Sequence, residues 1–209
     1  TYQDSGTDRK GGAIYVHWNS VVSIKACVFE DCQAQDDGGA IFSAGTISIE
    51  NSLFFDNEAT GNGDVYIGNL SATIINCTFS KNNSDKCFYN GGGSVNIINT
   101  IFYDNGNSGS YDVYSTNNSL NMSYCIFQDI NNNVSYFNSY TGMEISGFEF
   151  ASSYNNDFRL KHGSVGVDDG TDGSGAPSKD INGDSRDSDY DIGAYEWHCL
   201  QADVGDIVG

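Results

Sequence analysis

The strongest constraint on this chain is a phenylalanine that recurs at steps of 25, 25, 23 and 25 residues, at Phe29, Phe54, Phe79, Phe102 and Phe127. An isoleucine or methionine lies five residues before each phenylalanine, and a Cys, Ser or Thr lies two residues before it. An aliphatic–aromatic pair opens each unit, as in Ile14-Tyr15 and Ile41-Phe42. Matched residue types at fixed spacing in five units predict a repeat architecture.

Apolar and polar residues alternate within each unit, as in the segment TISIE at 46–50, and this is the period of a β-strand. Clusters of Gly, Asn and Asp between these segments predict turns. One unit cannot bury its apolar side alone, so units stack with equivalent residues about 4.8 Å apart. We therefore predict an all-β fold, a right-handed parallel β-helix (a solenoid) of about five to six rungs, with the hand taken from the general crossover preference.

Several columns of this repeat have predicted structural roles. The five phenylalanines are expected to stack inside the solenoid. Asn57, Asn82 and Asn105 each follow a phenylalanine by three residues and are expected to form a ladder of side-chain amides at a turn. The pairs Gly11-Gly12 and Gly38-Gly39 are expected to supply the positive φ of a tight corner.

The repeat fades after Phe137, and the sequence after Asn156 has no internal period. We predict that residues 1–150 form the β-helix and that residues 151–209 form an irregular C-terminal capping segment of the same domain. This segment carries 12 acidic residues and four basic ones.

The formal net charge of −19 excludes nucleic acid and anionic lipid surfaces as partners on electrostatic grounds. No apolar run approaches the roughly 20 residues of a membrane helix, so we predict no membrane-spanning segment. No charged-then-apolar leader precedes the first unit, and we expect Thr1 to follow a processing or cloning boundary.

The six cysteines include no CxxC pair. Cys27, Cys77 and Cys125 share one column on alternate rungs, about 9.6 Å apart and too far for a disulfide, so we predict buried small hydrophobic side chains. The pairing of Cys32, Cys87 and Cys199 stays open. The chain also has six N-x-Ser/Thr sequons, which are possible glycosylation sites where the secretory route glycosylates: Asn69, Asn76, Asn82, Asn117, Asn121 and Asn133.

Two sets of motifs resemble known families. The GGAI starts and the endings FFDN (54–57), FSKN (79–82) and FYDN (102–105) resemble the repeats of chlamydial polymorphic outer-membrane proteins. The C-terminal motifs are similar to the end of the secreted choice-of-anchor Q domain proteins; they are Asp157–Leu160, Asp168 with Gly170, Asp180–Arg186 and Asp191–Glu196. Ser164–Val167 departs from that pattern because it lacks the proline. The resemblance implies an exported, extracellular or cell-surface protein, often an adhesin.

The same fold occurs in pectate lyases and polygalacturonases, so carbohydrate chemistry has to be weighed. Lys25 and Glu50 fall on adjacent rungs and are predicted to form a cross-strand ion pair and not a lyase site. Asp168-Asp169, His162-Gly163 and Arg159–Lys161 contain polygalacturonase-like motifs, but in the wrong order and crowded into the C-terminal segment. The sequence favours a non-catalytic protein.

Oxygen-bearing side chains alternate near the C-terminus, and Asp180, Asn182, Asp184 and Asp191 are predicted calcium ligands. The alternative is that Asp180, Asp184 and Asp191 cap turns while Arg186 pairs with a carboxylate. His17-Trp18 and Trp197-His198 could each stack on a sugar ring or cover a solenoid end.

The function predicted from the sequence is an extracellular structural or adhesive surface module that could assemble end to end through an open strand edge. Its partner would be a glycan, a cell-surface protein or a copy of itself. The alternative is a carbohydrate-active enzyme, a pectate-lyase-like lyase before a glycoside hydrolase. A passive spacer is a third hypothesis that the sequence does not separate from an adhesin.

Overall fold

The structure is a computed structural model that describes residues 9–106, 110–117, 119–127, 146–173 and 175–198, together with the backbone of residues 137–144. These residues form β-strands and one short 3-10 helix, η1 (Ser153–Asn155). Within the described ranges, no helix is long and apolar enough to cross a membrane.

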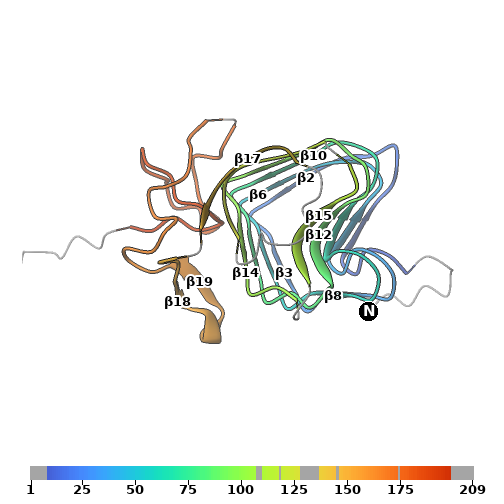
Figure 1. Cartoon of the computed structure of the whole chain (residues 1–209), viewed down its shortest axis with the longest axis horizontal. Helices are drawn as coiled ribbons and strands as arrows, with labels where there is room; N and C mark the ends of the chain where they lie inside the picture. The colour runs from blue at the N-terminus through green and yellow to red at the C-terminus, as the bar shows by residue number, and fades with distance from the viewer. Residues whose placement is uncertain are drawn as a thin grey trace, which may run out of the picture.

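Short strands follow one another around five coils. The first coil contains β1 (Ile14–Val16), β2 (Val21–Lys25), β3 (Val28–Glu30) and β4 (Gln33–Ala34), and the second contains β5 (Ile41–Ser43), β6 (Thr46–Glu50), β7 (Leu53–Phe55) and β8 (Glu58–Ala59). The third contains β9 (Val65–Ile67), β10 (Ala72–Ile75) and β11 (Thr78–Ser80), and the fourth β12 (Lys86–Asn90), β13 (Val95–Ile98) and β14 (Ile101–Tyr103). β15 (Tyr111–Ser115) and β16 (Leu120–Phe127) form the fifth coil, and β17 (Phe137–Glu144) follows. Figure 1 shows the coils nested behind one another.

Every pairing between successive coils is parallel, and equivalent strands build continuous sheets. One sheet has the order β1-β5-β9-β12-β15, a second runs from β2 through β16 to β3, and a short third sheet pairs β4 with β8. The register aligns Ile24, Ile49, Ile74, Ile97 and Met122, the column predicted from the sequence. The all-β parallel β-helix is therefore confirmed, and β17 extends it with shifts in register.

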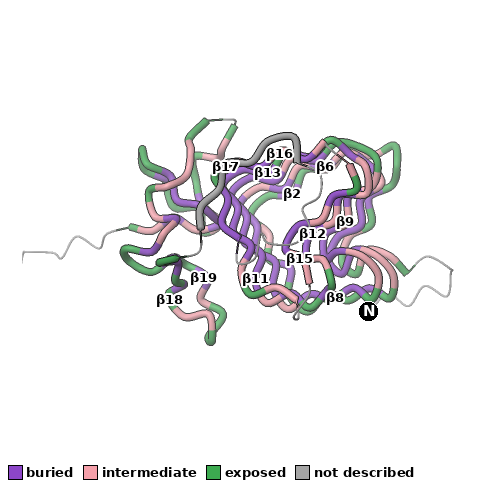
Figure 2. The backbone as a smooth tube through the Cα atoms, viewed as in Figure 1, coloured by how far each residue is buried: buried purple, intermediate pink, exposed green. Residues whose placement is uncertain are grey.

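The interior is filled by the predicted apolar columns. Phe29, Phe54, Phe79, Phe102 and Phe127 stack with ring centroids 4.5–5.2 Å apart and nearly parallel planes. Each ring covers the face of the next, which combines apolar burial with offset aromatic contact. Figure 2 shows the buried residues concentrated on the described strands of the middle coils.

An amide ladder runs beside the phenylalanine stack. Asn57 Nδ2 donates to Asn82 Oδ1 at 2.9 Å and to the Phe29 carbonyl at 3.0 Å, and Asn82 Nδ2 repeats both contacts with Asn105 and Phe54. Asn57 and Asn82 are buried. Each amide thus satisfies backbone and side-chain groups that the turn would otherwise leave unpaired inside the protein.

Residues with positive φ occupy a first corner in all five coils and a second corner in the first four, where the structure describes both. Ala26, Asn51, Asn76, Asn99 and Tyr124 occupy the first corner, and Asp31, Asp56, Lys81 and Asp104 the second, all with φ between 46° and 58°. Asn and Asp tolerate this left-handed region better than most residues, which explains their frequency at these columns.

The paired glycines have two different roles. Gly11 and Gly38 have φ of 71° and 76°, as expected. Gly12 and Gly39 do not have positive φ, and glycine is required there for steric reasons. A Cβ on Gly12 would lie 2.1 Å from the Gly39 carbonyl oxygen. The prediction of positive φ is therefore wrong for the second glycine of each pair.

Five cysteines lie in the described residues, and all are free thiols. Cys77 and Cys125 are fully buried, and burial raises the pKa of each thiol to about 12. Cys27 is partly exposed because it lies in the first coil. Cys199 lies outside the described residues.

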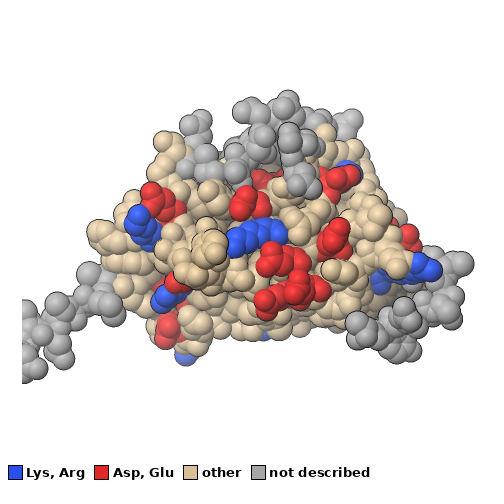
Figure 3. All heavy atoms as spheres, turned by 90° about the horizontal axis from the view of Figure 1, so that it is seen from below, with Lys and Arg blue, Asp and Glu red and all other residues tan. Residues whose placement is uncertain are grey.

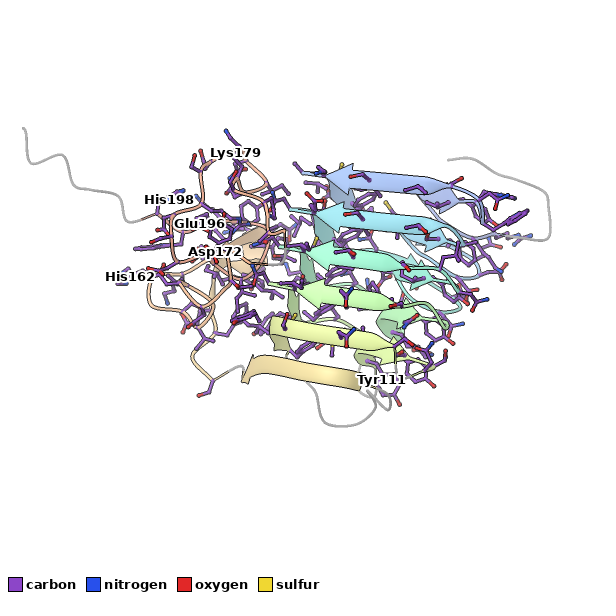
Figure 4. The ribbon with its side chains drawn as sticks, turned by 90° about the horizontal axis from the view of Figure 1, so that it is seen from above. Tyr111, His162, Asp172, Lys179, Glu196 and His198 are labelled. Carbon is purple, nitrogen blue, oxygen red and sulfur yellow. The ribbon has the colours of Figure 1, made fainter. Side chains whose placement is uncertain are left out.

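The C-terminal segment lies along the side of the coil (Figures 1 and 4), where β18 (Phe150–Ser152) and β19 (Asp157–Leu160) form an antiparallel pair. A second apolar core joins it to the outer side of the coil; its members include Leu53, Phe55, Ile101, Ile126, Phe148, Phe158 and Ile192. The capping role of residues 151–209 stays a prediction, since their described part packs against the flank of several coils.

Candidate functional site

Asp180 and Asp191, two of the predicted calcium ligands, are buried and bonded to backbone amides. Asp180 Oδ1 accepts from the amides of Asn182 and Asp184 at 2.8 and 2.9 Å, and its Oδ2 accepts from Glu196 at 3.2 Å. Asp191 Oδ1 accepts from the Asp168 amide at 2.8 Å, and its Oδ2 accepts from Trp197. Burial raises the pKa of Asp191 to about 7 despite these bonds.

Asn182 and Asp184 are exposed at the turn that Asp180 closes. No group of three or more His, Cys, Asp or Glu side chains that could hold a metal ion occurs in the described part of the chain. The local contacts of Asp180 are those of a turn cap, the alternative that the sequence left open, whereas Asp191 joins two separate stretches of the segment at Asp168 and Trp197. Calcium binding by these residues stays a prediction.

Arg186 holds the C-terminal segment together from the inside. Its guanidinium donates to Glu196 Oε2 at 2.7 Å, to the Gly193 carbonyl at 3.0 Å and to Asn51 Oδ1 at 3.2 Å. The side chains of Arg186 and Glu196 are 0% and 1% exposed. This buried ion pair links the segment to the second coil and has a structural role.

Three asparagines of the first corner form side-chain hydrogen bonds with the C-terminal segment, and the sequence analysis did not identify this role. Asn51 Nδ2 donates to the Lys179 carbonyl, and Asn76 Nδ2 lies 3.4 Å from the carbonyls of Asp191 and Gly193. Asn99 donates to the Thr171 carbonyl at 2.8 Å and accepts from its amide at 3.0 Å. Their spacing, three residues before each phenylalanine, is the signal that could have identified them.

The residues weighed as catalytic candidates lie in separate local contacts. Lys25 and Glu50 form the predicted cross-strand ion pair at 2.9 Å. Arg159 pairs with Asp157 at 2.6 Å, an exposed ion pair, and Lys161 pairs with Glu149. The His162 ring packs against Trp197 at 4.9 Å, and Asp169 Oδ2 accepts from the Gly166 amide at 3.0 Å. Asp168 and Trp197 are linked through Asp191, whose carboxylate accepts from both backbone amides, whereas Lys25 and Glu50 pair with each other on the coil.

The sequons differ in accessibility. Asn69 is exposed, and Asn117 and Asn121 are partly exposed. Asn76 and Asn82 are 0% and 1% exposed, and their side-chain amides are bonded inside the structure, so a glycan on either would be incompatible with this fold. Asn133 lies outside the described residues.

The feature that qualifies as a candidate binding site is a row of aromatic rings on the outer side of the sheet β1-β5-β9-β12-β15. Tyr15, Phe42, Tyr66, Tyr89 and Tyr114 are the second members of the aliphatic–aromatic pairs, and strand alternation turns them outward. Their ring centroids are 4.8–5.3 Å apart with interplanar angles of 10–18°. We call these five residues the aromatic stripe.

The stripe presents ring edges and phenol hydroxyls, because the ring faces are covered by their neighbours. Tyr15 is 49% exposed, Phe42 is buried, and the other three tyrosines are partly exposed. Burial raises the pKa of Tyr66 and Tyr89, with smaller contributions from nearby groups that include Asp37. These hydroxyls therefore stay protonated near neutral pH and can both donate and accept hydrogen bonds.

Charged side chains lie beside the stripe. Lys10 Nζ lies 4.9 Å from the Phe42 ring centroid and 3.8 Å from Asp37 Oδ2, and Lys86 Nζ lies 5.6 Å from the Tyr114 centroid. Asp37 is fixed by two hydrogen bonds of 2.9 Å from Asn62. The combination of hydroxyls, ammonium groups and a carboxylate along five coils can recognise an extended polar ligand.

The comparisons with known proteins identify the architecture. The sequence model of the family described as "Right handed beta helix region" matches residues 12–174, well over half of the chain. No curated protein and no solved structure gives a significant match. The matched range covers all five coils and reaches into the C-terminal segment. The chain belongs to the right-handed β-helix family.

Proposed function

We propose that this protein is an extracellular surface module that binds a glycan along the aromatic stripe and so acts as a structural or adhesive element. The observation that carries the proposal is the stack of five outward rings, each from a different coil, with hydroxyls and two ammonium groups at its edge. A rigid row with a period of about 4.8 Å suits an extended chain of sugar hydroxyls. The surface location rests on the sequence resemblance.

The test is binding of the intact chain to a glycan array, followed by titration calorimetry with the best ligand. The double variant Tyr66→Phe/Tyr89→Phe keeps the stack and removes two hydroxyls, and we expect about tenfold weaker binding because two hydrogen bonds are lost. Tyr154→Phe is the matched control, since Tyr154 is 92% exposed in the C-terminal segment. Equal affinity in all three proteins would reject the stripe as the binding site.

The carbohydrate-active enzyme stays the alternative, because the fold is compatible with both functions. The same glycans are incubated with the folded protein, with and without calcium, and new reducing ends and unsaturated products are followed. Turnover would replace the binding proposal with an enzymatic one.

End-to-end assembly belongs to the same proposal. In the first coil, Ile14, Val22, Cys27 and Cys32 are only partly buried, whereas Ile41 and Ile47 of the second coil are 0% and 2% exposed. Another solenoid coil packed on this edge would bury these side chains and pair the strands. A sedimentation profile that shows only monomer at high concentration would contradict assembly.

A further inference from the structure

Four Asn-Gly dipeptides occur in the chain, and the structure describes all of them: Asn62-Gly63, Asn90-Gly91, Asn105-Gly106 and Asn182-Gly183. An asparagine loses its side-chain amide when the backbone nitrogen of the next residue attacks Cγ and closes a five-membered ring. A following glycine favours the attack, because it has no Cβ to obstruct the ring. The asparagine side chain must turn toward that nitrogen, so hydrogen bonds that hold the side chain or the nitrogen oppose the reaction.

Asn90 and Asn105 are held in place by the coil. Asn90 is buried, and its side chain both donates and accepts hydrogen bonds. Asn105 belongs to the amide ladder and accepts from Asn82 Nδ2 at 2.9 Å. The attacking nitrogens, those of Gly91 and Gly106, each donate to a carbonyl of the preceding coil, at 2.7 and 2.5 Å. These two pairs can therefore react only after the coil opens locally.

Asn62 is held by Asp37, which lies one repeat earlier in the chain. The backbone amide of Asn62 and its Nδ2 both donate to Asp37 Oδ1 at 2.9 Å. Gly63, which carries the attacking nitrogen, is buried, and a Cβ on it would lie 2.8 Å from the Val65 carbonyl oxygen. Turning the Asn62 side chain toward Gly63 would break its bond with Asp37 in a crowded place.

Asn182 differs from the other three asparagines in its side-chain contacts. It is exposed, and its side chain has no hydrogen bond with the described residues. Its backbone amide donates to Asp180 Oδ1 at 2.8 Å, which fixes the main chain and leaves the side chain able to rotate. Gly183 is exposed as well, and no heavy atom lies within 4 Å of a Cβ built on it. The Gly183 nitrogen donates to the Asp180 carbonyl at 3.1 Å, and only this bond within the surface turn must open before the attack.

The turn around Asn182 lies on the outside of the C-terminal segment. Lys179 and Ser185 pair across it as an isolated antiparallel bridge. Figure 4 shows the Lys179 side chain at the edge of the segment, away from the coil strands. Water therefore has access to the turn, and its conformation can change without opening the coil.

We propose that Asn182 is a site of spontaneous deamidation in the folded protein. The Gly183 nitrogen forms a bond to Asn182 Cγ and loses its proton, the Cγ–Nδ2 bond breaks, and ammonia leaves with that proton. Water then opens the resulting succinimide at one of its two carbonyls and gives aspartate or isoaspartate. Both products add a carboxylate to a chain with a net charge of −19, on whose surface acidic side chains already gather, as the face in Figure 3 shows.

This modification goes beyond the proposed glycan binding and does not depend on it, because Asn182 lies outside the aromatic stripe. The isoaspartyl product also lengthens the main chain within the turn. The backbone amides of residues 182 and 184 bond to Asp180 Oδ1 in the unmodified protein, and the longer chain would displace them.

The test is peptide mapping by mass spectrometry after incubation of the intact chain at mildly alkaline pH, either folded or unfolded in guanidinium chloride. Trypsin cleaves after Lys179 and Arg186, so the peptide 180–186 contains Asn182 and no other asparagine. In the folded protein we expect Asn182 to convert about tenfold faster, or more, than the other three Asn-Gly pairs, because those require local opening. In the unfolded chain the four rates should become similar, because the dipeptide is the same.

Asn182→Gln is the matched control, since it keeps the exposed amide but would need a larger ring to react. Its peptide 180–186 should stay unchanged under the same conditions. The proposal is overturned if Asn182 in the folded protein converts no faster than the other three asparagines, or if it converts only after unfolding. Equal conversion of the Asn182→Gln peptide would also overturn it, because the mass change would then arise at another residue.

Discussion

The coil body, residues 12–127, and the C-terminal segment, residues 146–198, are held together by different kinds of contact. In the body, each residue type meets its own kind one coil away, as the phenylalanine stack and the Asn57–Asn82–Asn105 ladder show. In the segment, most contacts are made once, between side chains of different types such as Arg186 and Glu196. The packing of a repeat can therefore be predicted from the spacing of equivalent residues in the sequence, whereas the packing of a unique interface cannot.

The largest effect is expected from a substitution that disrupts the phenylalanine stack. Phe79 is fully buried, and its ring centroid lies 4.5 Å from that of Phe54 and 4.8 Å from that of Phe102. We expect Phe79→Ala to lower the free energy of unfolding by about 4 kcal/mol, because a large side chain is lost and a cavity forms. Urea unfolding measures it, with Phe79→Leu as the milder control; a loss below about 1 kcal/mol would show that the stack does not stabilise the coil.

The next effect tests the unique contacts of the segment. Arg186→Met leaves Glu196 buried without its partner and removes a donor to Asn51, so we expect a loss of about 3 kcal/mol and earlier proteolysis within residues 146–198. Arg159→Met is the control, since the Arg159 side chain is 61% exposed and its pair with Asp157 should contribute below about 1 kcal/mol. Equal losses in the two variants would contradict a central role for Arg186.

The smallest effect concerns a buried carboxyl group inside the coil. Asp64 is 0% exposed, at a column that holds Ala40 in the second coil, Cys87 in the fourth and Asp112 in the fifth. Ser84 donates to its Oδ1 at 2.5 Å, and Oδ2 has no hydrogen-bond partner among the described residues. Burial raises the pKa of this carboxyl well above its ordinary value.

The raised pKa means that the folded protein binds the proton of the Asp64 carboxyl more tightly than the unfolded chain does. The contribution of this protonation to the free energy of unfolding is therefore complete below about pH 4 and is lost as the pH rises through the pKa of the folded state. Asp64→Asn keeps an acceptor for Ser84 and cannot ionise, so we expect it to be about 1 kcal/mol more stable than the unchanged protein at pH 8 and to show a flatter pH dependence. Asp191 contributes a slope of the same sign, so some dependence remains. Thermal unfolding from pH 4 to 8 measures this, with the exposed Asp85→Asn as the matched control. An Asp64→Asn slope equal to that of the unchanged protein would show that Asp64 does not bind the proton.

The coil could be predicted from the sequence because the residue patterns that determine its strands and packing are local and recur in every unit. Strand alternation, the phenylalanine spacing and the paired register all follow from comparing one unit with the next. The aromatic stripe was present in the aliphatic–aromatic pairs, although the sequence did not indicate that the rings outside the coil would stack.

The lateral position of the C-terminal segment could not be predicted in this way. Its binding surface on the coil consists of outward residues such as Leu53, Phe55 and Ile101, which break the alternation of their strands. The triplets LFF and IFY indicate burial on both sides, but they do not say which segment covers the outer one. The acidic motif near Asp180 was equally consistent with calcium ligands and with turn caps, because the same oxygens serve both.

Hydrogen–deuterium exchange of the intact chain and of Arg186→Met tests most directly whether the two regions are held independently. The backbone amides of the inner strands bond from coil to coil, as in β6–β10–β13, and do not depend on the segment. We predict that Arg186→Met raises exchange within residues 146–198 and leaves these strands protected. A rise in exchange spread evenly over the coil strands would contradict the account, since the segment and the coil would then form one cooperative unit.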